Sequence, residues 1–275
     1  MDELKDDLKW SESQDDVWID RDGFPFLAFA VVCDSLCVVE QALSKIQKIS
    51  DPHKRRLRIQ GRVPKHGLVE LGITGGMTSL MLAMACSEKR IVSLLLKHGA
   101  DPYESRDILG HDAFMMACIM NCTENVKFWL DRYPDWNLER RCKVNGSYAL
   151  AMAVYTGPRR QELVNLLLAQ GASVNEVTDT GNSILLSVCI SDDGDPEILN
   201  ILLERSSVRK TINYRSRGRT LKWRNIHRLA RFLTKKKLTN SGLMTALAQD
   251  SGSTALHYAV QRGDVDVVNL LLQHG

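Results

Sequence analysis

The stretch DSGSTALHYAVQRGDVDVVNLLLQHG, from Asp250 to Gly275, decides the fold of this 275-residue chain. A second stretch, GGMTSLMLAMACSEKRIVSLLLKHGADPY from Gly75 to Tyr103, follows the same pattern. Each has a glycine, a threonine two residues later, a short run rich in apolar residues, and a Leu-Leu pair before another glycine. Because the pattern recurs, it predicts a series of similar structural units in which each unit buries its apolar side against its neighbours.

Glycines that open a unit recur at intervals close to 34 residues. The successive gaps are 53, 34, 36, 35, 37 and 34 residues, so only the first interval holds a long insertion, of roughly 20 residues. These glycines are Gly23, Gly76, Gly110, Gly146, Gly181, Gly218 and Gly252. The spacing predicts an acidic segment or cap at 1–19 and a repeat domain at 20–275, with units at 20–46, 73–105, 107–139, 143–177, 178–213 and 249–275, an insertion at 47–72, and a degenerate basic copy at 214–248.

Both stretches are similar to the ankyrin repeat consensus, and the resemblance covers about residues 20–275. It implies an all-α solenoid of stacked helix-turn-helix units with projecting finger loops. Within a unit, the opening glycine permits the turn, and Ser or Thr two residues later can cap the first helix. That position holds Thr78, Ser183, Thr220 or Thr254 in four copies and Pro25, Asp112 or Tyr148 in three, so we expect uneven capping. Gly99, Gly171 and Gly275 stand where a left-handed helix end is expected.

The composition is typical of a globular protein, with 44% apolar and 25% charged residues. The longest charge-free stretch, Leu71 to Ser87, contains three glycines and is shorter than the roughly 20 apolar residues of a membrane span. The N-terminus MDELKDDLKW lacks the apolar core of a secretory signal. Seven cysteines fit neither a disulfide framework nor a paired zinc site, so we expect reduced thiols. These features predict a cytoplasmic location, with the nucleus as the alternative.

No catalytic constellation is present in the sequence: there is no phosphate loop, no HExxH and no GxSxG. His257 belongs to the turn of its repeat, and His98 and His274 precede the glycines that end helices. Cys118 and Cys189 take an alanine position, where a small apolar side chain packs between helices. We therefore predict no catalytic residue, no metal site, no cofactor and no enzymatic activity.

The segment from Arg205 to Lys237 departs most from the repeat pattern, since it carries 13 Lys and Arg and no acidic residue in a chain of net charge +3. From Leu221 onward, apolar residues recur at three- and four-residue steps, which predicts an amphipathic helix. The apolar stripe is Trp223, Ile226, Ala230 and Leu233, widened by Leu229 and Phe232. The other face and the C-terminal end hold Lys222, Arg224, Arg228, Arg231 and Lys235 to Lys237.

Three interpretations of this basic segment stay open. The stripe docks on neighbouring repeats and the charges are solvated. Alternatively, the segment binds an acidic protein partner, including a calmodulin-like protein that grips large apolar anchors. The third and least favoured interpretation is binding to nucleic acid or an anionic membrane, because the basic residues of the segment are not interleaved with several aromatic side chains. The candidate contact residues are Arg215, Arg217, Arg219, Trp223, Arg224, Arg228, Arg231 and Phe232.

The insertion at 47–72 predicts an enlarged finger. Pro52 and Pro64 bound it, and Gly61 and Gly67 offer turn points, which favours an ordered loop or hairpin over a helix. Binding residues concentrate in loops on rigid scaffolds, but long surface insertions are also tolerated without a function. Both interpretations stay open.

The ankyrin resemblance implies protein recognition through finger tips and the first helices, which line a concave groove. The matching finger positions are Arg106, Asp107, Lys143, Thr178 and Asp179. We therefore predict a non-enzymatic scaffold or adaptor for protein partners. One alternative is the targeting domain of a longer enzyme or channel, suggested by a last repeat that stops at Gly275 without a finger or cap. The other alternative is an anion- or nucleic-acid-binding module, which would bind more weakly as salt increases.

Overall fold

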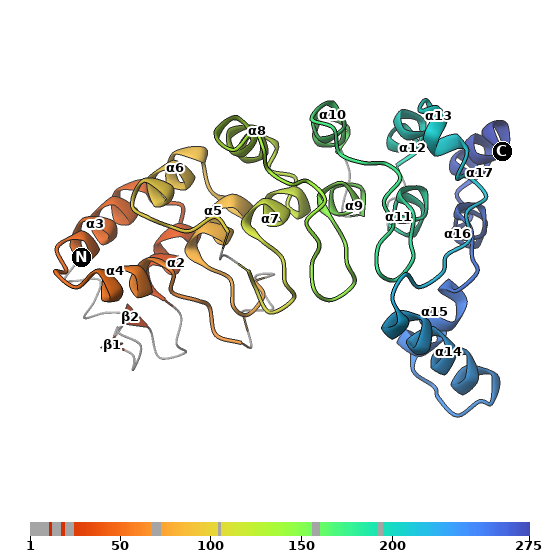
Figure 1. The fold of residues 1–275 in the computed structure, drawn as a ribbon, viewed down its shortest axis with the longest axis horizontal. Helices are drawn as coiled ribbons and strands as arrows, with labels where there is room; N and C mark the ends of the chain where they lie inside the picture. The colour runs from red at the N-terminus through yellow and green to blue at the C-terminus, as the bar shows by residue number, and fades with distance from the viewer. Residues whose placement is uncertain are drawn as a thin grey trace. The chain divides into compact units, whose positions relative to one another are not determined.

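The computed structural model describes residues 11–12, 18–19, 25–65, 67, 73–103, 106–155, 160–191 and 195–275 (Figure 1). The chain divides into two compact units, Met1–Trp136 and Asn137–Gly275, and each is described by itself. Most of the predicted N-terminal cap at 1–19 lies outside the described residues. Within it, β1 (Ser11–Glu12) pairs antiparallel with β2 (Trp18–Ile19).

The first unit is built from helix pairs packed in two rows. Its helices are α2 (Phe26–Val32), α3 (Leu36–Gln47), α4 (Pro52–Ile59), α5 (Ser79–Cys86), α6 (Lys89–Lys97), α7 (Ala113–Ile119) and α8 (Thr123–Arg132). The first row is α2, α5 and α7, and the second row is α3, α6 and α8. Helix α4 packs on α3.

The second unit is built on the same plan. Its helices are α9 (Ala149–Tyr155), α10 (Gln161–Ala169), α11 (Ile184–Ile190), α12 (Pro196–Leu203), α13 (Ser206–Arg209), α14 (Leu221–Lys235), α15 (Gly242–Asp250), α16 (Ala255–Arg262) and α17 (Val265–His274). The first row is α9, α11 and α16, and the second row is α10, α12 and α17. Helices α14 and α15 pack on each other (Figure 1).

The two rows differ in how their residues are buried. In α5, SLMLAMAC, every residue except Cys86 is buried, because this short apolar helix has neighbours on all sides. In α6 only one stripe is buried, consisting of Ile91, Val92, Leu95 and Leu96. The repeated Leu-Leu pair thus belongs to the buried stripe by which second-row helices pack on the core. The predicted all-α solenoid is confirmed.

Most helix ends follow the local chemistry of the sequence. Thr78, Ser183 and Thr220 accept hydrogen bonds from backbone N–H groups of the first helical turn, and Thr254 forms a capping box with His257. Asp112 also caps, since its carboxylate accepts from Met115 N at 2.9 Å. Pro25 has no side chain that can do so. Gly99 and Gly171 have φ of +96° and +89°, as expected for left-handed helix ends.

The prediction that the 47–72 insertion is a loop or hairpin is wrong for α4. Asp51 accepts a hydrogen bond from His53 N at 2.8 Å, and Pro52 occupies the first helical position, where its missing N–H costs nothing. Ile59 is buried and anchors the helix. After α4 the chain forms the base of a finger, in which Val63 N donates to Met77 O at 2.9 Å.

The expected repeat at 214–248 is also absent from the stack. Helix α16 packs directly on α11, and α17 packs directly on α12. The 15-residue helix α14 is longer than the first-row helices and lacks their apolar, all-round surface. Residues 214–248 are therefore not a repeat layer, although Thr220 caps α14 in the manner of a repeat.

Candidate protein-interaction surfaces

The position of α14 and α15 follows from the hydrogen bonds that close the finger loops. In finger 178–182, Thr178 N donates to Asn182 O at 3.0 Å. In the last finger, Ser216 N donates to Ser253 O at 2.8 Å in the same way. Three residues separate Thr178 from Asn182, whereas residues 217–252 separate Ser216 from Ser253. Helices α14 and α15 thus form a helical hairpin inserted in the tip of the last finger.

The start of this insertion is joined to the preceding finger. Arg219 N donates to Asp179 O at 2.9 Å, just as Asp179 N donates to Asn145 O at 2.8 Å one finger earlier. Gly181 lies against Arg217 with a φ of +99°, and a Cβ there would be 2.2 Å from Arg217 O. The row of fingers therefore continues up to Arg219, immediately before α14 begins.

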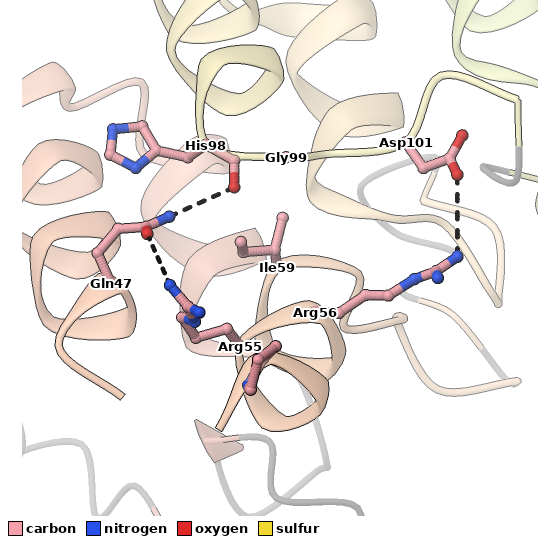
Figure 2. Close-up of a pocket in the computed structure, with 8 residues that line it drawn as sticks. Gln47, Arg55, Arg56, Ile59, His98, Gly99 and Asp101 are labelled. Atoms are coloured by element: carbon pink, nitrogen blue, oxygen red, sulfur yellow. Dashed lines mark hydrogen bonds and ion pairs between the residues drawn. The ribbon is translucent and has the colours of Figure 1, made fainter. Parts of the chain in front are cut away.

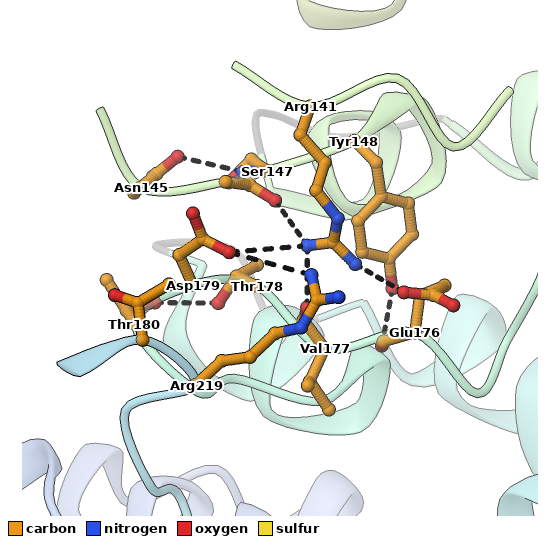
Figure 3. Close-up of polar contacts among 12 residues, drawn as sticks. Arg141, Asn145, Ser147, Tyr148, Glu176, Val177, Thr178, Asp179, Thr180 and Arg219 are labelled. Carbon is orange, nitrogen blue, oxygen red and sulfur yellow. Dashed lines mark hydrogen bonds and ion pairs between the residues drawn. The ribbon is translucent and has the colours of Figure 1, made fainter. Parts of the chain in front are cut away.

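Arg141 fastens two neighbouring fingers together (Figure 3). Its Nη1 donates to Gly146 O at 2.9 Å and to Val177 O at 2.8 Å, and its Nη2 pairs with the Glu176 carboxylate. The guanidinium carbon lies 5.6 Å from the centre of the Tyr148 ring. Because Arg has several donors in a fixed plane, a single side chain can fix both backbones in place.

Asp179, a predicted finger contact, lies between two arginines (Figure 3). Its Oδ1 is 3.8 Å from Arg141 Nη1 and 3.6 Å from Arg219 Nη1. The Asp179 side chain is 26% exposed, and that of Arg219 is 48% exposed. The carboxylate thus partly neutralises the positive charge where the hairpin begins.

Asp107, another predicted finger contact, is buried in the first unit. Its carboxylate accepts from Thr74 Oγ1 at 2.7 Å and from the backbone N–H groups of Leu109 at 3.0 Å and His111 at 2.8 Å. It also contacts His111 Nδ1 at 3.0 Å. Burial alone would raise the pKa of Asp107, but the bonds from His111 and Thr74 outweigh it and lower the pKa. This side chain shapes its finger from the inside.

The other predicted finger residues differ in exposure. Thr178 is buried, Arg106 is half-buried with its Nη1 on a carbonyl of its own turn, and Lys143 is exposed. Sequence reasoning did not single out the apolar residues beside them, Ile108 and Val144, which are 53% and 44% exposed. The finger pattern places a residue at a tip but gives no sign of which side chains turn inward.

Part of the predicted apolar stripe of α14 packs against α15. Ala230 and His227 are buried, and Trp223, Ile226 and Leu233 are half-buried. The Trp223 ring centre lies 6.0 Å from that of His227. Burial lowers the pKa of His227, and neither of its ring nitrogens has a hydrogen-bond partner in the described part of the chain. Trp223, proposed from sequence as a partner anchor, therefore contributes to the hairpin's own packing.

The remaining apolar residues of α14 face solvent. Phe232 is 55% exposed, Leu229 52% and Leu221 73%. Sequence reasoning selected Phe232 as a contact and left out the two leucines. Leu221, Leu229 and Phe232 are separated by eight and three residues, which places them on one side of the helix. This spacing could have revealed a second apolar face of α14 from the sequence.

The predicted basic contacts fall into two classes. Arg224 is tied to the turn before α14, because Nε donates to Gly218 O and Nη2 to Arg219 O, both at 3.1 Å. The exposed members are Arg215, Arg217, Arg219, Arg228 and Arg231. The hairpin and its approach therefore present a basic surface.

Comparison with known proteins gives the family. Residues 114–215 match the description "Ankyrin repeats (3 copies)", and residues 75–108 and 251–275 match "Ankyrin repeat". The chain belongs to the ankyrin repeat family. The basic hairpin occupies the gap between the last two matches.

Relatives of this ankyrin repeat chain include the nuclear factor NF-kappa-B p105 subunit of Gallus gallus. The two are 30% identical over 173 residues, or 62% of this chain and 17% of the relative, so the chain spans about a sixth of that protein.

Two solved structures share the fold. The ankyrin repeat domain of Bcl-3, described as a unique member of the IkappaB protein family, has a TM-score of 0.55 and 23% identity, covering 93% of this chain and 88% of that chain. A chain from the complex of the predatory endopeptidase Bd0816 of Bdellovibrio bacteriovorus with the immunity protein Bd3460 has a TM-score of 0.58 and 16% identity, covering 90% of this chain and 96% of that chain. At these identities the likeness is one of fold alone.

The first ankyrin unit has a pocket of about 380 Å³ where α4 meets α3 and the end of α6 (Figure 2). Gln47 Nε2 donates to His98 O at 3.4 Å, and Arg55 Nη1 donates to Gln47 Oε1 at 3.5 Å. Arg56 lies 3.9 Å from Asp101. The polar groups of the walls thus bond to one another and attach the inserted helix to the neighbouring repeat.

The described residues of the ankyrin chain contain no group of three or more His, Cys, Asp or Glu that could hold a metal ion. No helix among them is long and apolar enough to cross a membrane. The described residues contain no disulfide, and burial raises the pKa of Cys189 to about 12, which makes its thiolate scarce.

Proposed function

We propose that this chain is a non-enzymatic scaffold or adaptor that holds protein partners through its fingers, its first-row helices and the inserted hairpin. Ankyrin repeats indicate a protein-interaction role. The observation that supports the finer proposal is a row of fingers, fastened by Arg141 and ending in a basic hairpin with exposed apolar side chains.

The construction of the fingers favours binding over catalysis. Backbone bonds close each loop, and Arg141 joins two of them, so few residues need to become ordered when a partner binds. The side chains left exposed at the tips are those of Lys143 and Val144 in the second unit and Ile108 in the first. We place the protein in the cytoplasm or nucleus, in keeping with its likeness to a nuclear factor subunit and an IkappaB-family domain.

Partner capture from a lysate of the source cells tests the contribution of the fingers. A variant with Lys143→Glu and Val144→Asp changes one finger tip, and a matched control with Lys97→Glu and Val265→Asp makes the same charge change at exposed residues of second-row helices. We expect the tip variant to lose proteins that the parent and control retain. Circular dichroism verifies that all three are folded. Recovery of the same proteins on both variants would contradict a finger-mediated function.

A further inference from the structure

One face of α14 carries an apolar seam that no part of the described chain covers. Leu221, Asn225, Leu229 and Phe232 follow one another at steps of four, four and three residues, which places them on one side of a helix. All four are exposed, the three apolar residues by 52% to 73%. The seam is about 16 Å long, since an α-helix rises about 1.5 Å per residue.

The opposite face of α14 already has its partner. His227 and Ala230 point to that side and are buried in the hairpin formed with α15. No other described helix packs extensively on α14. The seam is therefore a second apolar face, separate from the packing that holds the hairpin together.

Cations border this seam on both sides. Helical geometry places Lys222 on one flank and Arg228, Arg231 and Lys235 on the other. All four are exposed, and none of them forms an ion pair within the described residues. The Asp179 carboxylate lies before the helix begins and pairs with Arg219, and the Asp250 carboxylate of α15 acts on His227, on the opposite face of α14. The charge at the seam is thus left for a partner to neutralise.

We propose that this seam binds an acidic amphipathic helix of a protein partner. The inference rests on the proposed interaction function and names the chemistry of one partner. Apolar side chains of the incoming helix cover Leu221, Leu229 and Phe232, and its Glu or Asp residues pair with the bordering cations. Asn225 lies within the seam and fixes the register by requiring a polar residue opposite it.

Other occupants fit this face less well. A second copy of the chain would set two strongly basic segments against each other. A membrane surface calls for a broad apolar face, and this seam is narrow and interrupted by Asn225. Single-stranded nucleic acid needs successive stacking platforms, whereas Phe232 is the only well-exposed aromatic residue of α14.

Fluorescence anisotropy with designed peptides tests the proposal on the full chain. The probe is a helical peptide of about 18 residues with leucines opposite Leu221, Leu229 and Phe232, an asparagine opposite Asn225, and glutamates on both flanks. One comparison peptide has the same composition in scrambled order, and another has lysine in place of glutamate. We expect the acidic amphipathic peptide to bind at least about tenfold more tightly than both, and more weakly as salt rises.

Variants of the chain assign the binding to the seam. We expect Phe232→Ala, and the pair Arg228→Glu with Arg231→Glu, each to weaken peptide binding by about tenfold or more. The matched control is Leu272→Ala, which shortens a leucine that is 60% exposed on α17 and should leave binding unchanged. Circular dichroism verifies folding of every variant.

Three results would overturn the proposal: equal binding of the three peptides, equal binding by the seam variants, or tighter binding of phosphatidylserine vesicles or single-stranded RNA than of the acidic peptide. The finger variant described above separates this failure from failure of the proposed function. If it still loses cellular partners while the seam binds no peptide, only the seam proposal is wrong.

Discussion

Helices α11 and α14 belong to the same unit but are built for different surroundings. In α11, ILLSVCI, six of the seven residues are buried and none is charged. In α14, LKWRNIHRLARFLTK, only His227 and Ala230 of the 15 residues are buried, and five are Lys or Arg. A helix that is apolar all round must be covered on all sides, so α11 lies between α9 and α16, whereas α14 needs only α15.

This difference assigns stability to the repeat stack and recognition to the inserted hairpin. The stack gains its free energy of folding from packing between adjacent repeats. The hairpin does not interrupt this packing, because α16 still packs on α11 and α17 on α12. An insertion at a finger tip can therefore carry charge and exposed apolar groups that the interior of the stack could not contain.

Truncating one leucine in each region should give the largest contrast. Leu199 in α12 is fully buried, so we expect Leu199→Ala to lower the free energy of unfolding by about 2–5 kcal/mol through lost burial and a cavity. Leu229 in α14 is 52% exposed, so Leu229→Ala should change it by less than about 0.5 kcal/mol. Urea denaturation measures both. Similar losses would mean that the seam is covered within the chain.

Arg141→Met tests whether the fingers depend on this side chain. It removes the hydrogen bonds to Gly146 O and Val177 O and the pair with Glu176, and we expect a loss of about 1.5–3 kcal/mol in the free energy of unfolding. Arg219→Met is the matched control at the base of the hairpin. That side chain is 48% exposed and its pair with Asp179 spans 3.6 Å, so its loss should cost no more than about 1 kcal/mol. An equal cost for both variants would contradict the assigned role.

The repeat rows could be predicted from sequence because their signals are local. The Leu-Leu pair of α6 and the capping by Thr78 both depend on residues a few positions apart. The hairpin could not be distinguished from a degenerate repeat in this way, because Gly218 and Thr220 have the local form of a repeat opening. What distinguishes it is the hydrogen bond from Ser216 to Ser253, which joins residues far apart in the chain.

The candidate site was only partly predictable for a related reason. Family resemblance gave finger positions for Asp107 and Lys143, but burial depends on partners elsewhere in the sequence. Thr74 and His111 bind the Asp107 carboxylate and turn it inward, whereas Lys143 remains exposed. In α14, periodicity identified the amphipathic helix, but which apolar face is covered depends on where α15 packs.

His227 should make the hairpin less stable in acid. Because burial lowers its pKa in the folded hairpin, the unfolded segment binds a proton first as pH falls below the ordinary histidine value of about 6.5. The hairpin therefore has its full stability above that pH, where His227 is neutral in both states, and loses stability as the pH falls below it. Arg231 opposes protonation and Asp250 favours it, but burial is the largest effect.

Replacing this side chain isolates the effect. We expect His227→Leu to stabilise the hairpin by about 1 kcal/mol at pH 7.5, since two unpartnered ring nitrogens are removed from the interior, and by more at pH 5.5. Amide hydrogen exchange of α14, compared between parent and variant at the same pH, measures this. An advantage that does not grow at pH 5.5 would contradict the titration of His227.

Excising the hairpin should change the stability of the stack only slightly. Replacing residues 217–251 with the two-residue segment that corresponds to Asp179 and Thr180 restores a finger of the usual length, because Gly252 N bonds to Ser216 O as Gly181 N bonds to Thr178 O. The excision removes the ion pair between Arg219 and Asp179 and the hydrogen bond from Tyr258 to Asp250, neither of which is fully buried. We expect the free energy of unfolding to change by less than about 1 kcal/mol and binding of the acidic peptide to disappear. A chain that unfolds on excision would show that the hairpin stabilises the repeats, and the division between a stabilising stack and a recognising hairpin would then be wrong.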